Sequence, residues 1–248
     1  MFPLGVLTTA LGIRRCAFSS SWLIDAAAKP GRSWIARIPS AALSLLLLDD
    51  CRVCGLPLHN ASRIPVCPSC LAKPQHLTSD FFCTCCRTPF RNQSPLDEQG
   101  RCALCRTGWP GFDAAYSFGS FDNELRELIH IFKYGRVQAL AKPLGRYLRQ
   151  ALPAGERFDA VTPMPLHWTR RWSRGFNQSA LLAREISRGT GFPVLPAVRR
   201  VRRTAAQAGL TRAGRRGNVA RAFTVRNPDR IRGKRILLVD DVMTTGAT

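Results

Sequence analysis

Apolar residues follow two different periods along the second half of the chain, and together they predict an α/β fold. Ile236 to Val239 is a continuous apolar run, which is typical of a strand buried on both faces of a parallel sheet. Shorter strands are expected at 116–121, 158–162 and 222–225. Helical spacing of apolar residues predicts helices from about residue 122 to Gly135, from 137 to 151 and from 178 to 188.

The amino-acid composition and the apolar pattern divide the chain into three parts. Over residues 1–33 we expect an unstructured extension or a start codon placed too early, and over 33–48 an amphipathic leading helix. Residues 49–108 are rich in Cys and Pro, and residues 109–248 have the α/β pattern. No apolar run reaches the ~18–20 residues that span a bilayer. Arg14 and Arg15 follow the first apolar stretch, the wrong order for a secretory signal. We expect a cytoplasmic protein without membrane insertion.

The middle part contains four Cys-x-x-Cys pairs. Two such pairs can complete one tetrahedral metal site, so the pattern predicts two structural zinc ions in a double zinc ribbon. Disulfides and a redox or iron–sulfur role are the alternatives. Pairing in sequence order is our prediction, and interleaved pairing is the other possibility. The proposed ligands are Cys51, Cys54, Cys67, Cys70, Cys83, Cys86, Cys102 and Cys105.

The chain is strongly basic, with a formal net charge of +21. So much positive charge favours an anionic partner: a nucleic acid, a phosphorylated substrate or an acidic membrane surface. An Arg-rich proteome would produce the same excess without any such partner.

Two adjacent carboxylates, Asp240 and Asp241, end the apolar run and lead into a loop rich in Thr and Gly. Carboxylates accept hydrogen bonds from the vicinal hydroxyls of a ribose, and a loop of hydroxyls and backbone N–H groups suits its phosphate. A buried strand that simply ends in a polar turn is the alternative. The string resembles the signature of type I phosphoribosyltransferases, which bind phosphoribosyl pyrophosphate (PRPP). That resemblance implies a PRPP site formed by Asp240, Asp241, Thr244, Thr245, Gly246, Ala247 and Thr248.

Two groups of arginines are candidates for phosphate contacts. Arg170, Arg171 and Arg174 follow a predicted strand end, where guanidinium groups could clamp a diphosphate, although a solvated basic loop would look the same. The second group lies in the segment 199–216, which has no acidic and no aromatic residue. Such a segment suits a mobile lid over PRPP, or contacts to nucleic-acid phosphates rather than to bases. It consists of Arg199, Arg200, Arg202, Arg203, Arg212, Arg215 and Arg216.

Several motifs together resemble the ComF/GntX family over about residues 49–248. They are the Cys-x-x-Cys pairs, Phe132-Lys133-Tyr134, Arg174-Gly-Phe-Asn-Gln178 and Val239 to Gly246. The resemblance implies a type I phosphoribosyltransferase-like parallel sheet with helices on both faces, preceded by the double zinc ribbon. It also implies a link to DNA uptake in natural competence, with single-stranded DNA as a partner.

The same resemblance implies roles for further groups at the ligand site. Lys133 joins Arg170, Arg171 and Arg174 on the pyrophosphate side of PRPP, and Mg²⁺ is held mostly by oxygens of the ligand and by water. In the family a helix and a strand follow the Thr-rich loop, so we expect a truncated C-terminal end.

Three functions remain open from the sequence. The chain could be a phosphoribosyltransferase, in which a nitrogen nucleophile displaces pyrophosphate from PRPP. It could be a non-catalytic protein that binds single-stranded DNA and uses the sugar-phosphate site for regulation. It could also be an inactive fragment. The acceptor and the catalytic residues are not identified by the sequence.

Overall fold

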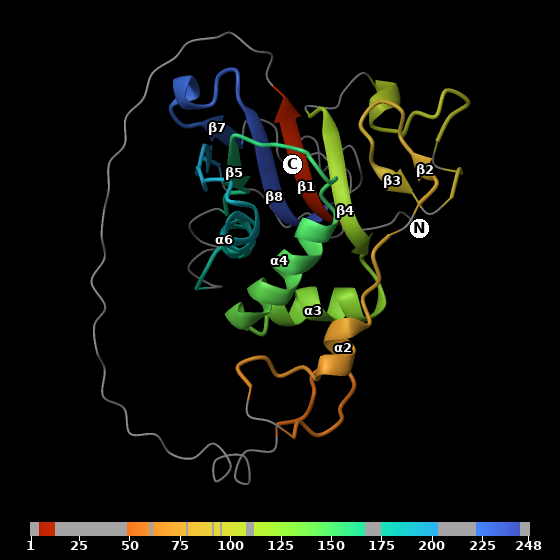
Figure 1. Cartoon of the computed structure of the whole chain (residues 1–248), viewed down its shortest axis with the longest axis vertical. Coiled ribbons are helices and arrows are strands. Elements are labelled where there is room, and N and C mark those ends of the chain that lie inside the picture. The colour runs from red at the N-terminus through yellow and green to blue at the C-terminus, as the bar shows by residue number, and fades with distance from the viewer. Residues whose placement is uncertain are drawn as a thin grey trace.

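The structure is a computed structural model that describes residues 5–12, 49–59, 62–77, 79–90, 92–94, 96–107, 112–166, 175–202 and 222–243 (Figure 1). Its strands are β1 (Gly5–Gly12), β2 (Phe81–Phe82), β3 (Pro89–Phe90), β4 (Ala114–Ser120), β5 (Ala160–Pro163), β6 (Val198–Arg200), β7 (Phe223–Val225) and β8 (Arg235–Met243). Its α-helices are α2 (Pro68–Ala72), α3 (Asn123–Lys133), α4 (Ala141–Gln150) and α6 (Gln178–Thr190), with 3-10 turns η1 (Cys105–Thr107), η2 (Gln138–Leu140) and η3 (Pro228–Arg230). The expected helix at 33–48 falls outside the described residues.

The central sheet has four strands in the order β4-β1-β8-β5. β5 and β8 run parallel, with Ala160 opposite Ile236 and Pro163 opposite Val239. β1 is antiparallel to both β4 and β8, so the sheet is mixed and the prediction of a parallel sheet holds only for the β5–β8 pair. The expectation of an unstructured extension is likewise wrong for 5–12, because this segment fills the space between β4 and β8 with strand hydrogen bonds.

The helices form where the apolar spacing predicts them, and they cover one face of the sheet. In α3 the residues Leu125, Leu128, Ile129 and Phe132 are all buried, as the helical period requires. α4 and α6 contact each other, and α6 packs on β5 and β8. Gly145 permits this close approach, since a Cβ there would lie 2.4 Å from Cβ of Glu185. Among the described residues, no helix combines the length and the apolar character that crossing a bilayer requires.

The two faces of β8 bury their side chains against different partners. Leu237 and Val239 belong to the main core with α3, α4 and α6. Ile236 belongs to a smaller cluster with Ala160 of the neighbouring β5, Ala197 just before β6 and Ile231 just after η3, none of which lies on an α-helix. The implied arrangement of helices on both faces is therefore not seen within the described ranges, where irregular chain covers the second face of β8.

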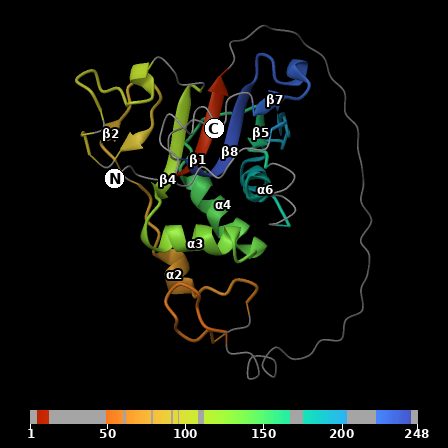
Figure 2. The same cartoon turned by 180° about the vertical axis from the view of Figure 1, so that it is seen from behind.

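The two cysteine modules lie apart in the molecule (Figures 1 and 2). The first, residues 49–73, ends in α2 and packs against α3 and α4, where the Tyr147 hydroxyl donates a hydrogen bond to the Leu71 carbonyl and Lys73 pairs with Glu124 at 3.2 Å. The second, residues 79–107, lies beside β4, where the Ala115 N–H donates to the Cys86 carbonyl at 2.9 Å. Each module is therefore attached to the α/β domain by its own contacts.

Candidate functional site

The acidic doublet lies at the carboxyl end of β8, and other elements supply a partner for each carboxylate. Asp241 is buried, and its Oδ1 lies 2.9 Å from Nζ of Lys133 at the end of α3. Asp240 is half-buried, and its Oδ1 accepts hydrogen bonds from the Ser179 hydroxyl at 3.0 Å and from the backbone N–H of Asp241 at 2.9 Å. Residues far apart in the sequence thus meet at one end of the sheet.

The start of α6 is fixed beside this doublet by the residues that precede it. Asn177 caps the helix: its side-chain oxygen accepts from the Ala180 N–H, and its Nδ2 donates to the Met164 carbonyl at 3.1 Å, just after β5. The ring of Phe176 lies 5.6 Å from that of Phe132, one residue before Lys133. The positive end of the α6 dipole and the Lys133 ammonium therefore both stand at the acidic doublet, an arrangement suited to an anionic ligand.

Burial and the neighbouring charge of Asp241 raise the pKa of Asp240 to about 7, although Lys133, the Asp241 N–H and the Ser179 hydroxyl oppose the shift. The charge of Asp241 and the burial of the site thus make the charged form of Asp240 unfavourable up to near neutral pH. A ligand that brings hydroxyl donors or a metal cation would favour the doubly ionised form. Without a ligand, two ionised carboxylates at this position are electrostatically unfavourable, and groups with perturbed pKa values of this kind are frequent at binding sites.

Asp240→Asn is expected to remove a pH dependence of stability. The folded chain keeps the Asp240 proton up to about pH 7, whereas the unfolded chain releases it near pH 4. Because the folded state binds more protons in this window, its stability falls as the pH rises from about 4 to 7. Thermal melts should show the wild type losing stability relative to the variant across the window and not below it. A difference that is constant from pH 4 to 8 would contradict the assignment.

The eight cysteines form two groups in sequence order. In each group the four sulfur atoms lie within 4.8 Å of one another, and the groups are Cys51, Cys54, Cys67, Cys70 and Cys83, Cys86, Cys102, Cys105. The Cys54–Cys67 and Cys86–Cys102 sulfur pairs are 3.8 Å apart. A tetrahedral zinc with Zn–S bonds of about 2.3 Å needs sulfurs about 3.8 Å apart. Both groups could therefore hold a zinc ion, and the interleaved pairing does not occur in the structure.

Backbone N–H groups favour a thiolate at Cys51 and at Cys102, whereas burial raises the pKa of Cys70 and Cys105, and the hydrogen bond with Cys102 together with burial raises the pKa of Cys86. The Cys67 N–H donates to Cys51 Sγ and the Cys102 N–H donates to Cys83 Sγ, each at 3.3 Å. Burial disfavours the Cys51 thiolate, but backbone N–H groups outweigh it and lower the pKa of that thiol to about 6. A hydrogen bond from Cys86 lowers the pKa of Cys102 to about 5 against the effect of burial. All cysteines of the described segments are free, so no disulfide competes with a metal there.

Comparison with known proteins gives relatives that cover most of the chain. Competence protein F of Haemophilus influenzae is 31% identical over 189 residues, which is 70% of this chain and 82% of the relative. The DNA utilization protein YhgH of Escherichia coli K12 is 30% identical over 226 residues, or 88% of this chain and 87% of the relative, and that of Salmonella typhimurium is 29% identical over the same length. The chain belongs to the ComF/GntX family. No protein-family model and no solved structure matches it.

Only some of the residues predicted for the ligand site and for nucleic-acid contacts are described by the structure. Asp240, Asp241 and Lys133 come together, as the previous contacts show. Arg199 and Arg200 lie on β6, where the guanidinium of Arg200 sits over the Phe223 ring of β7 at 5.2 Å, and Arg202 follows on an exposed turn. The remaining predicted residues lie outside the described ranges: Thr244, Thr245, Gly246, Ala247, Thr248, Arg170, Arg171, Arg174, Arg203, Arg212, Arg215 and Arg216.

Sequence reasoning missed Ser179 as a member of the site. Its signal was present, because Ser179 is the second residue of the helix that opens with the capping residue Asn177. A hydroxyl in the first turn of a helix beside a strand end is well placed to contact a carboxylate or a phosphate. The structure adds it to the doublet through the 3.0 Å contact with Asp240.

Proposed function

We propose that this ComF/GntX protein binds a ribose phosphate of the PRPP type at the carboxyl end of β8 and serves DNA uptake or utilisation. The observation that carries the proposal is the convergence of Asp240, Asp241, Lys133 and Ser179 at this point. Ligands of open α/β sheets bind beyond the carboxyl ends of the strands. The biological role is supported by relatives named for competence and for DNA utilization.

Each group has a distinct part in holding the ligand. The carboxylates of Asp240 and Asp241 accept hydrogen bonds from the ribose hydroxyls, and the ligand thereby compensates for the charge that the free doublet resists. Lys133, which pairs with Asp241 at 2.9 Å in the free protein, is within reach of a phosphate on the same side. The Thr-rich segment 244–248 continues directly from β8 and cradles the 5-phosphate in this proposal.

A transferase reaction would use the same arrangement. The bond between the anomeric carbon and the pyrophosphate oxygen breaks, a bond from a nitrogen nucleophile to that carbon forms, and pyrophosphate leaves. Mg²⁺, if bound with PRPP mostly through phosphate oxygens and water, would neutralise charge on the leaving group. The part of this chain is to orient the ribose through the two aspartates and to place positive charge at Lys133 and the α6 N-terminus.

Calorimetric titration of the protein with PRPP and Mg²⁺ tests the proposal. We expect a dissociation constant between about 1 μM and 1 mM, the range typical of enzyme substrates. Ribose 5-phosphate and pyrophosphate each carry only part of the groups through which PRPP would contact the site, so each should bind more weakly than PRPP. Folded, metal-loaded protein that gives no heat with PRPP would rule out the ribose-phosphate site.

Binding of single-stranded DNA is a second candidate function, favoured by the net charge of +21 and by the basic β6–β7 hairpin. Cationic side chains that contact phosphates release counterions on binding. The affinity for an oligothymidine should therefore fall steeply with salt, and Arg199→Gln with Arg202→Gln should reduce the slope of log affinity against log salt by about 1 to 2. A slope near zero for the wild type would exclude phosphate contacts as the basis of binding.

A further inference from the structure

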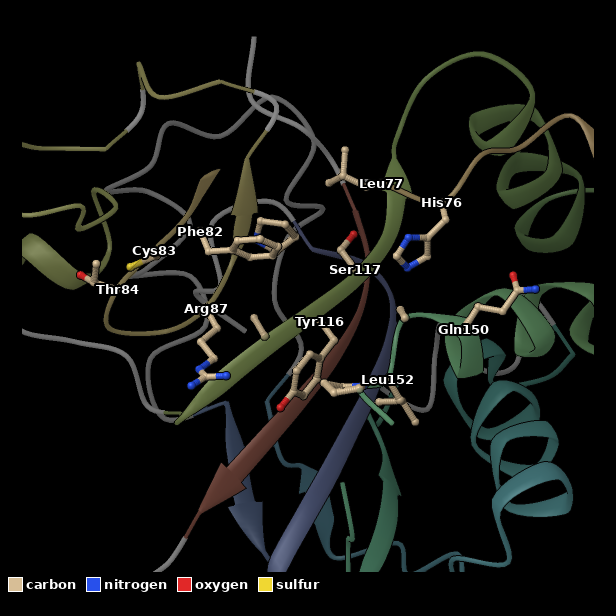
Figure 3. A pocket seen from close by; sticks show the side chains of 14 residues that line it. His76, Leu77, Phe82, Cys83, Thr84, Arg87, Tyr116, Ser117, Gln150 and Leu152 are labelled. Carbon is tan, nitrogen blue, oxygen red and sulfur yellow. The ribbon is translucent and has the colours of Figure 1, made fainter. Parts of the chain in front are cut away.

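A cavity of about 670 Å³ opens between the second cysteine module and the α/β domain, away from the acidic doublet (Figure 3). Four segments line it: the connector at 76–77, the knuckle at 82–89, β4 at 115–117 and the end of α4 at 150–153. Its size is within the range of about 300–1,000 Å³ that is typical of pockets for small ligands. Of its lining side chains only Cys83 has been given a role above, as a metal ligand of the second cysteine group.

The walls of the cavity are largely apolar and partly aromatic. Phe82 is 49% exposed, which is a large exposed fraction for a phenylalanine. Tyr116 on β4 and Leu152 after α4 face the same space, and His76 borders it with its ring 5.6 Å from that of Phe118 (Figure 3). Flat aromatic side chains around an open space suit a flat ligand, which can stack on them.

Arg87 places a positive charge at the edge of this cavity by an unusual backbone conformation. The residue after the first Cys-x-x-Cys pair of each module is left-handed: Gly55 has φ of 74° in the first module and Arg87 has φ of 55° in the second. Both N–H groups make the same bond, Gly55 to the Cys51 carbonyl at 2.7 Å and Arg87 to the Cys83 carbonyl at 2.9 Å. Glycine adopts this conformation without strain, whereas arginine does not. The second module thus keeps a strained residue at a position where a glycine fits, and its side chain lines the cavity.

We propose that this cavity receives an unpaired base of single-stranded DNA, with Arg87 on the adjoining phosphate. The proposal deepens the second function above and rests on it. Aromatic surfaces beside a cation are the means by which proteins bind single strands without regard to sequence. The bases of a duplex are stacked and paired, so they could not enter without being flipped out. A single strand is therefore the form of DNA that fits.

Fluorescence anisotropy with a labelled oligothymidine and with a blunt duplex of equal length tests the proposal. Phe82→Ala should weaken binding of the single strand by about 5- to 150-fold, the range seen when one stacking residue is removed. Leu56→Ala, at a side chain that is 63% exposed on the first module, is the matched control and should change nothing. The duplex should be affected much less, since its backbone contacts do not need the cavity.

Arg87→Gly separates function from folding. It should weaken binding of the single strand while the melting temperature stays the same or rises, because glycine relieves the left-handed backbone. Arg106→Gln, at an exposed residue of the same module outside the cavity, is the matched control for charge. If Arg87→Gly and Arg106→Gln weaken binding equally, only the general charge matters and the cavity proposal is wrong.

Photocrosslinking provides a readout that does not depend on a variant. An oligonucleotide with 5-iododeoxyuridine should crosslink to peptides containing 76–89 or 115–117. Crosslinks confined to the β6–β7 hairpin, or undiminished affinity of Phe82→Ala, would overturn the cavity proposal and leave DNA binding intact. A wild-type protein that does not bind the oligothymidine at all would overturn the DNA-binding function and the cavity proposal together.

Discussion

Replacing Asp240 and Asp241 together by Asn is expected to weaken the binding of PRPP with Mg²⁺ by about 100-fold or more. A hydrogen bond to a charged group contributes about 1.5–3 kcal/mol, and the double variant changes two of them. Asn preserves the shape of the side chains, and its oxygen can still accept from the Ser179 hydroxyl. The loss therefore reports on charge at the site and is read from calorimetric titrations of the variant and the wild type.

The fold should tolerate this change. The raised pKa of Asp240 indicates that its charge is unfavourable in the free protein, so its replacement offsets part of the cost of leaving Lys133 without the charge of Asp241, and the double variant should remain folded at pH 8 with a lowered melting temperature. Asp229→Asn is the matched control, because the Asp229 side chain on η3 is 90% exposed and lies outside the site. A double variant that binds PRPP as tightly as the control would contradict the role assigned to the carboxylates.

Loss of a single metal ligand is expected to have different consequences in the two cysteine modules. Cys51 and Cys70 belong to the main hydrophobic core, whereas Cys83, Cys86, Cys102 and Cys105 form a separate cluster with Phe90. A structural zinc site contributes on the order of 10 kcal/mol to folding. Cys70→Ser should therefore lower the melting temperature of the whole protein by about 10 °C or more, at about 2–4 °C for each kcal/mol. Cys86→Ser should unfold mainly the second module.

Hydrogen exchange and metal analysis distinguish these outcomes. In Cys86→Ser the amides of 79–107 should lose protection while those of α3 and β8 keep it, and the zinc content should fall from about two ions per chain to one. Cys85→Ser is the matched control, since Cys85 is exposed, adjacent in sequence and not part of either group. A Cys86→Ser protein with unchanged zinc content would contradict the assignment of the second site.

The sequence predicted those features that depend on local periodicity. Helix α3 follows from the spacing of Leu125, Leu128, Ile129 and Phe132, all of which are buried, and the apolar run from Ile236 to Val239 lies in the buried part of β8. The Cys-x-x-Cys spacing predicted that the two cysteines of each pair share one ion, because both come from one tight turn, whereas the structure decides between sequential and interleaved combination of the pairs. These predictions need no knowledge of distant contacts.

Features that depend on distant contacts were missed. β1 has the apolar and β-branched composition of a strand, yet its place between β4 and β8 is set by hydrogen bonds to segments more than 100 residues away. Lys133 was expected at the ligand site only from the family resemblance, and Ser179 was missed, because both come from helices whose relative position depends on tertiary packing. The separation of the two cysteine modules depends in the same way on contacts with α3 and β4. Sequence periodicity contains no information of this kind.

The geometry suggests how the first cysteine module and the ligand site depend on each other. The first module packs against α3 and α4 through the Tyr147 hydroxyl and the Lys73–Glu124 pair, and Lys133 ends the same α3 helix. A metal ion that stabilises this module therefore also stabilises the position of α3, and with it the position of Lys133. The second module, by contrast, borders the cavity near β4 and has no described residue at the doublet.

The central claim is that a ribose phosphate binds where β8 ends, and a crystal structure of the protein soaked with PRPP and Mg²⁺ tests it most directly. We predict density for the ribose with its hydroxyls within hydrogen-bond distance of the carboxylates of Asp240 and Asp241, and Lys133 turned from Asp241 toward a phosphate. Density for the ligand at another place, with the Lys133–Asp241 pair intact and the end of β8 free of ligand, would contradict the claim.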